Sequence, residues 1–198
     1  VMSRGMQTDS LVSHIDITPS LLDFAGELDS VKHRPRHWIS PQDFWKDSPD
    51  VLVENHGPRR GLPSYHGRSW IPVLSDPAHS IHDIHFASHT FHEIQMYYPM
   101  RAARDHEWKL IWNIAHPLPY PFASDLWAAS SWQAQFQNSL DAPYGMKTVH
   151  EYIHRPRFEL YHLSKDPHET QNLAKDPRYS AILLKYQEKL KALQIYLL

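Results

Sequence analysis

The segment from His92 to Arg101 contains three side chains whose types could bind a charged sugar. Glu93 could accept hydrogen bonds from sugar hydroxyls or pair with a substrate ammonium group. His92 could donate to a sulfate oxygen when its imidazole is protonated, which acidic pH favours. Arg101 follows an aromatic pair and offers a planar fork that suits a carboxylate or sulfate group. The alternative is structural, with His92 and Glu93 ending a strand and Arg101 making an ion pair, and residue types alone favour it.

The composition excludes several other kinds of site. The chain of 198 residues has no Cys, and therefore neither a disulfide nor a thiolate ligand. Its 20 basic and 22 acidic side chains give a formal charge of −2, so there is no electrostatic case for a nucleic acid partner. A locally basic pocket could still bind a polyanion. Among the 16 His residues, five are candidate metal ligands, His14, His33, His37, His56 and His66, but they lack the tight clustering with carboxylates that is typical of metal sites, so no metal ligand is predicted. No apolar run approaches the ~20 residues of a membrane span.

Alternation of apolar and polar residues predicts the elements that would position these side chains. The predicted strands are residues 84–87, 97–104, 107–114 and 158–161. Asp105-His106-Glu107 is a short polar break, which predicts a hairpin that joins the second strand to the third. We therefore expect a small, mainly antiparallel sheet of four strands.

A C-terminal helix over residues 177–195 is expected to pack against this sheet. Asp176 can cap it and Pro177 suits its first turn. An apolar stripe then repeats at intervals of three and four residues, formed by Tyr179, Leu183, Tyr186, Leu190 and Leu193. The predicted fold class is α+β.

Two further helices are predicted outside this sheet-and-helix unit. Within residues 11–26, Thr18 is the predicted N-cap, Pro19 the first helical residue and Gly26 the residue after the helix. Residues 124–140 could form the other helix.

The remaining features of the chain favour structural roles. Between residues 27 and 80 repeated Pro residues interrupt every periodic run, which predicts a long ordered connecting loop. The domain boundary is therefore placed between residues 1–80 and 81–198. Asp166 and Glu169 have the spacing of a capping box, and Asn172 suits a turn, so we interpret them as structural.

Four strings of the sequence resemble the C-terminal portion of the sulfatase family, within the alkaline-phosphatase-like superfamily. They are residues 16–23, 66–72, 86–101 and 158–174. The last string is shared by sulfatases broadly, whereas residues 86–101 resemble the heparan-sulfamidase branch, which acts on N-sulfoglucosamine. The resemblance implies that residues 1–80 are the tail of the sulfatase α/β domain with its connecting loop, and that residues 81–198 are the C-terminal subdomain.

The parts of a sulfatase that perform its chemistry have no match in this chain. The family's nucleophile is a formylglycine made from Cys or Ser in a [Cys/Ser]-x-Pro-x-Arg motif. Ser75-Asp76-Pro77-Ala78-His79 has His where Arg is required. The resemblance also implies a calcium site with an Asp-Asp and an Asp-Asn pair, and neither dipeptide occurs in this sequence. We therefore expect calcium and formylglycine to come from a missing N-terminal region, no catalytic residue in this chain, and no activity of the chain alone.

With the resemblance, we predict His92, Glu93 and Arg101 as substrate-binding residues at the rim of a sulfatase pocket. The expected substrate is a sulfated sugar or glycosaminoglycan, of which N-sulfoglucosamine is the leading candidate. The expected partner is the missing N-terminal domain, and a second copy in a homodimer is the other option. The resemblance implies a lysosomal, periplasmic or secreted protein. The alternative is a non-catalytic carbohydrate-binding or interaction module with the same fold.

Overall fold

The computed structural model describes residues 5–28, 67–93 and 96–197, with side chains described up to residue 194. The chain divides into two compact units, Val1–His82 and Asp83–Leu198. Most of the predicted Pro-rich loop, and the start of the string at residues 66–72, lie outside the described residues. None of the helices in the described ranges is both long and apolar enough to span a membrane.

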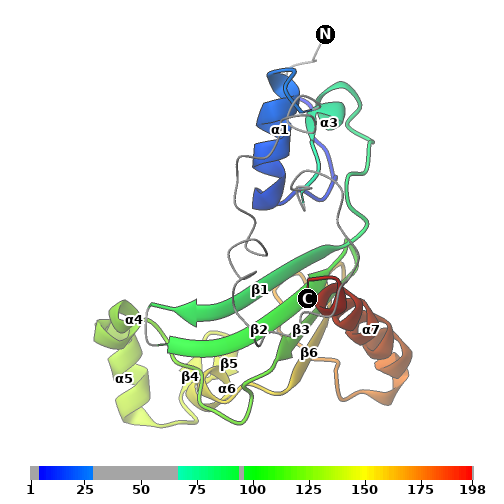
Figure 1. The fold of residues 1–198 in the computed structure, drawn as a ribbon. Coiled ribbons are helices and arrows are strands. Elements are labelled where there is room, and N and C mark those ends of the chain that lie inside the picture. Colours follow the sequence, from blue (N-terminus) through cyan, green and yellow to red (C-terminus); the bar gives the residue numbers. More distant parts are fainter. Residues whose placement is uncertain (1–4, 29–66, 94–95, 198) are drawn as a thin grey trace, which may run out of the picture. The chain divides into compact units, whose positions relative to one another are not determined.

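The second unit is built on a sheet of four strands in the order β1-β2-β3-β6 (Figure 1). The strands are β1 (His85–His92), β2 (Met96–Arg104), β3 (Trp108–Asn113) and β6 (Phe158–His162). Each neighbouring pair is antiparallel, and the predicted β2–β3 hairpin is present, with Arg104 paired to Lys109. The predicted α+β fold with a four-stranded antiparallel sheet is confirmed, and β1 extends to His92 rather than ending at residue 87.

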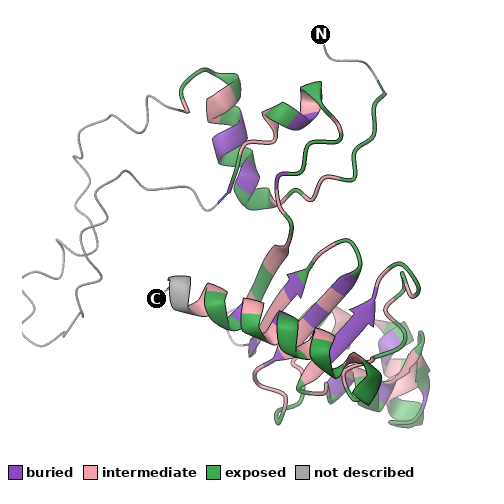
Figure 2. Cartoon of the chain, turned by 90° about the vertical axis from the view of Figure 1, so that its right-hand side faces the viewer, coloured by how far each residue is buried: buried purple, intermediate pink, exposed green. Residues whose placement is uncertain are grey.

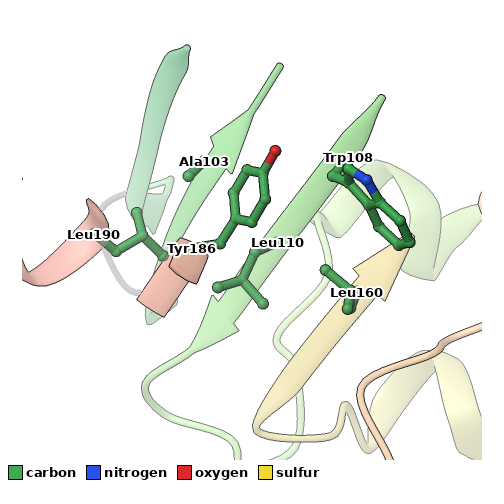
Figure 3. Close-up of a cluster of buried hydrophobic side chains, with 6 residues drawn as sticks. All are labelled: Ala103, Trp108, Leu110, Leu160, Tyr186 and Leu190. Carbon is green, nitrogen blue, oxygen red and sulfur yellow. The ribbon is translucent and has the colours of Figure 1, made fainter. Parts of the chain in front are cut away.

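A C-terminal helix covers one face of the sheet, as predicted. A short 3-10 turn (Pro177–Tyr179) leads into α7 (Ser180–Leu197), and Asp176 accepts a hydrogen bond from the Arg178 N–H at its start. Tyr186 and Leu190 of α7 pack against strand residues in a buried cluster (Figure 3) that also contains Ala103, Trp108, Leu110 and Leu160. The Tyr186 hydroxyl donates to Asp105 in the β2–β3 turn. Figure 2 shows the outward side of α7 exposed, as the apolar stripe requires.

Shorter elements form a second cluster in the same unit. They are α4 (Ser124–Ala128), α5 (Ser130–Asn138), β4 (Pro143–Tyr144), β5 (Lys147–Thr148) and α6 (Val149–Ile153). The single helix predicted over residues 124–140 is wrong, because Ala129 is extended with ψ 126°. Trp127 and Trp132 would point about 140° apart on one continuous helix. The break lets both rings reach Phe122, at centroid distances of 5.8 and 4.7 Å.

The first unit contains a 3-10 turn (His14–Asp16), α1 (Ile17–Phe24) and α3 (Ile71–Ser75). The predicted cap at Thr18 is wrong, because the helix starts at Ile17 and Thr18 lies inside it. Gly26 follows the helix with φ +71°, as predicted for a residue at that position.

Asp16 is the buried hub of this first unit. Its carboxylate accepts hydrogen bonds from the Ser13 N–H (2.7 Å) and the Arg68 N–H (2.8 Å), and it contacts His82 Nε2 at 3.0 Å. Burial opposes its ionisation, but the Arg68 N–H and His82 bonds hold the pKa of Asp16 below its ordinary value. Gly67 packs so close to this hub that a Cβ on it would lie 2.0 Å from the Ile15 carbonyl oxygen.

The capping box predicted at Asp166 and Glu169 is also wrong. Asp166 accepts from the Gln171 N–H at 2.8 Å and the Thr170 hydroxyl at 3.0 Å in a turn that starts no helix. Glu169 instead pairs with Lys109 of β3, Nζ to Oε2 2.7 Å. Asn172 accepts from the Leu160 N–H and donates to the Phe158 carbonyl, so it fastens the following loop to β6. Asp166, Glu169 and Asn172 thus have structural roles, but through these contacts rather than through a capping box.

Candidate functional site

The turn that ends β1 holds two of the three predicted site residues. His92 is the last residue of β1, is exposed, and stacks against His89 with ring centroids 6.5 Å apart. Glu93 follows with φ +55°, a left-handed conformation that is uncommon for residues other than Gly. Its Oε1 accepts from the Ser124 hydroxyl at 2.9 Å and from the Ser124 N–H at 3.3 Å. This contact ties the strand end to α4 and leaves the exposed carboxylate facing solvent.

Arg101 lies in the middle of β2 and is half-buried. Its Nη1 donates to the Met100 carbonyl at 2.8 Å and to the His89 carbonyl at 3.3 Å. Within the described ranges its guanidinium pairs with no carboxylate, so the expected alternative of a structural ion pair is not what the geometry shows. Arg101 pairs in register with Ser88, four residues before His92 on β1.

The sheet register assigns Arg101 to the face that α7 covers. Arg101 pairs directly with Trp112, and the neighbouring pair Ala103–Leu110 packs under α7 on the same side. This assignment does not extend to the hairpin end. Between the pairs His89–Met100 and Phe91–Tyr97, β2 advances three residues and β1 two, so β2 contains an extra residue and its alternation is interrupted there.

An exposed aromatic pair at the same strand end was not identified from sequence. Phe91 and Tyr97 are 59% and 54% exposed, and their ring centroids are 5.2 Å apart. Exposed rings of this kind offer apolar surface on which a sugar ring could stack. The sequence showed aromatics in this segment, but alternation alone does not tell which of them are exposed. The candidate site at this position is therefore the hairpin end: Phe91, His92, Glu93, Tyr97 and Arg101, with Ser124 supporting Glu93.

The string at Glu159-Leu160-Tyr161 has a structural explanation. Glu159 is buried, and its carboxylate accepts from the Tyr161 hydroxyl at 2.5 Å and from Asn113 Nδ2 at 2.8 Å. Burial would raise the pKa of Glu159, but these bonds, with Lys147 and Arg155 nearby, hold it below its ordinary value. Burial and the neighbouring carboxylate raise the pKa of Tyr161. The two side chains thus form one network on the face of the sheet away from α7, while Leu160 packs in the core.

In the described parts of the chain, no group of three or more His, Cys, Asp or Glu side chains is placed to hold a metal ion. The origin of the calcium that the sequence resemblance implies stays a prediction.

Comparison with known proteins relates the chain to a larger hydrolase. It is 30% identical over 190 residues to human (Homo sapiens) N-sulphoglucosamine sulphohydrolase, a match that covers 94% of this chain and 32% of the relative. The chain thus spans about a third of that protein's length. No family model matches the chain.

Two solved structures share its fold at low sequence identity. One, solved in complex with its substrate D-glucosamine-2-N,6-O-disulfate, is 14% identical with a TM-score of 0.52, and the match covers 98% of this chain and 26% of that one. The other, a phosphonate monoester hydrolase of Agrobacterium radiobacter, is 18% identical with a TM-score of 0.51, covering 98% of this chain and 27% of that one. These likenesses concern the fold alone. The sequence match therefore supports the resemblance of this chain to the C-terminal portion of the sulfatase family.

Proposed function

We propose that this chain is part of a sulfohydrolase that removes sulfate from a sulfated sugar, with an N-sulfated glucosamine of the heparan type as substrate. The observation that supports this proposal most directly is the 30% identity over 190 residues to N-sulphoglucosamine sulphohydrolase. The hairpin end supports it independently, because it combines exposed rings, a carboxylate and a nearby guanidinium, which together suit a sugar with anionic groups.

Within this proposal each side chain at the hairpin end has a distinct role. Glu93 Oε1 is held by Ser124, whereas its Oε2 accepts no hydrogen bond from the described part of the protein and can accept one from a sugar hydroxyl. The Phe91–Tyr97 pair supports the sugar ring, and a ring N–H of His92 donates to a sulfate oxygen. Arg101, from the middle of β2, contributes positive charge.

The bond-breaking step is assigned to residues outside this chain. A formylglycine nucleophile and a calcium ion would supply the attacking oxygen and stabilise the developing negative charge. This chain would contribute only to binding and orienting the sugar, and its partner would be the N-terminal part of a longer protein. We also expect, from the family resemblance, a lysosomal, periplasmic or secreted location, and a homodimer remains a prediction.

The purified chain alone should therefore not hydrolyse a sulfate ester or sulfamate. Incubation with a chromogenic aryl sulfate should give no release above a heat-denatured sample. Release that survives a chelator and tracks with the chain during purification would contradict this expectation, because it would require a nucleophile among residues 1–198.

The binding role of Glu93 is tested by Glu93→Gln in the longest native protein that contains this chain. A hydrogen bond to a charged group contributes about 1.5–3 kcal/mol, so kcat/KM on an N-sulfated glucosamine should fall about ten- to a hundredfold. Glu188→Gln, at an exposed position on α7, is the matched control and should leave kcat/KM unchanged.

Two outcomes would count against the proposal in different ways. Unchanged kcat/KM and unchanged melting temperature in Glu93→Gln would remove Glu93 from the binding site. Sugar binding without any sulfate release by the native protein would instead favour the alternative, a non-catalytic carbohydrate-binding module.

A further inference from the structure

A pocket of about 340 Å³ lies beside α7 on the face of the sheet that this helix covers. It is formed entirely within the second unit and lies outside the hairpin end. Its lining residues, which define the α7 pocket, are Trp112, Arg157, Phe158, Gln187, Leu190 and Lys191. This volume lies at the lower end of the range of ordinary small-ligand pockets, about 300–1,000 Å³.

The floor of the α7 pocket includes an aromatic surface. Trp112 of β3 and Phe158 of β6 are directly paired in register, and their ring centroids are 6.1 Å apart with an interplanar angle of 35°. The guanidinium carbon of Arg157 lies 5.3 Å from the centre of the Phe158 ring. A cation over a ring in this arrangement is held by the ring quadrupole while its outer donors remain available.

Two charged side chains line the α7 pocket, and both are positive. Arg157 comes from the segment before β6, and Lys191 comes from α7, so the two cations are contributed by different elements. Gln187 lies one turn before Lys191 on the same side of α7 and adds a side-chain amide. Neither cation has a carboxylate partner within the described parts of the chain, so both can interact with an anionic ligand.

The neighbouring residues extend the same chemistry across the sheet. Arg101 pairs with Trp112 in the next strand and so lies beside the pocket on the same face. A ligand longer than one sugar could therefore contact the α7 pocket and Arg101 together.

We propose that the α7 pocket is a second binding site, for an acidic sugar residue of an oligosaccharide. The sugar ring stacks on Trp112 and Phe158, and its sulfate or carboxylate lies between Arg157 and Lys191. Gln187 hydrogen-bonds a ring hydroxyl. The choice of a sugar as ligand rests on the proposed function, whereas the selection for negative charge follows from the pocket itself.

Binding of a heparin-derived tetrasaccharide to the 198-residue chain, measured by titration calorimetry, tests this inference. The variant is Arg157→Gln combined with Lys191→Gln, both at exposed positions, so that the fold is retained. The matched control is Lys165→Gln combined with Lys175→Gln, which removes the same charge from exposed positions outside the pocket. The dissociation constant should rise about tenfold in the pocket variant, and by less than about twofold in the control.

Two further ligands distinguish recognition of the sugar from simple attraction of an anion. A neutral chitotetraose should bind much more weakly than the tetrasaccharide, and sodium sulfate at the same anion concentration should not displace it. Equal losses in the two double variants, no loss in either, or full displacement by sulfate would each overturn the inference. Sulfate release by the longer native protein is a separate measurement. Its absence would overturn the proposed function while a pocket-specific loss of binding still supported an acidic-sugar site.

Discussion

Replacing Glu159 by Gln should destabilise the second unit while preserving its shape. The Glu159 carboxylate is 4% exposed and accepts two short hydrogen bonds, from the Tyr161 hydroxyl and from Asn113 Nδ2. Lys147 Nζ lies 3.5 Å away and is partly exposed, so it contributes little. The network, rather than a single contact, determines the expected result.

The expected loss of stability depends on how the Gln side-chain amide would bond to Asn113 and Tyr161. The Gln carbonyl can accept from Asn113, and its NH₂ can donate to the Tyr161 hydroxyl, which can itself accept. Two bonds to a charged group, about 1.5–3 kcal/mol each, would become two neutral bonds of about 0.5–1.5 kcal/mol each. The variant also avoids burying a charge, which offsets part of this difference. We expect a net loss of about 1–2 kcal/mol in the free energy of unfolding.

Urea unfolding of a double-mutant cycle provides the measurement. The cycle comprises Glu159→Gln, Tyr161→Phe and the double variant, with Glu188→Gln as an exposed control. The two network positions should show a coupling energy of about 1 kcal/mol or more, as expected for groups in one hydrogen-bond network. A coupling below about 0.5 kcal/mol, or a Glu159→Gln variant more stable than the parent, would refute this reasoning.

The pH dependence provides an independent check on the same carboxylate. The pKa of Glu159 in the folded chain lies below its ordinary value of 4.5. Its contribution to stability is therefore fully present above that value and is lost as the pH falls through the folded pKa. The difference in unfolding free energy between parent and Glu159→Gln should be large at neutral pH and should shrink below about pH 4. A difference that grows on acidification would contradict the assigned direction.

The remaining predictions concern the first unit. Gly67→Ala would place a Cβ 2.0 Å from the Ile15 carbonyl oxygen. The resulting backbone shift should cost about 1–3 kcal/mol and lower the hydrogen-exchange protection of the Arg68 N–H; unchanged protection would contradict the close packing. Asp16→Asn leaves one acceptor oxygen for two backbone donors, so one of the two N–H groups should lose protection. Because the folded pKa of Asp16 is lowered, protection in the parent chain should persist down to its ordinary value of 3.8 and fall below it; loss of protection already at pH 5 would show that the carboxylate is not the group that titrates.

Local patterns in the sequence were sufficient to predict most of the second unit. Alternating residues predicted the four strands, because side chains alternate across a sheet whatever surrounds it. The apolar stripe and the Asp176-Pro177 start predicted α7, because both depend on neighbouring residues only. The same approach failed where a side chain had a distant partner. Thr18 was predicted to cap a helix that in fact begins one residue before it, at Ile17. The residue before this helix is Asp16, whose carboxylate accepts a hydrogen bond from the distant Arg68 N–H.

The candidate site also combines features that neighbouring residues determine with features that depend on distant contacts. The residue types at positions 92, 93 and 101 were compatible with binding of a charged sugar, since donors and acceptors are properties of single residues, and the family resemblance made them the predicted binding residues. Their arrangement depended on the pairing of β1 with β2, whose register shift near Phe91 brings the exposed Phe91 and Tyr97 rings together at the strand end. The α7 pocket could not have been predicted, because its lining comes from three segments that only the packing of α7 on the sheet brings together. The sequence by itself determined the elements and the available chemistry, which are local properties, whereas the tertiary structure decided exposure, facing and proximity, which depend on contacts between residues far apart in the chain.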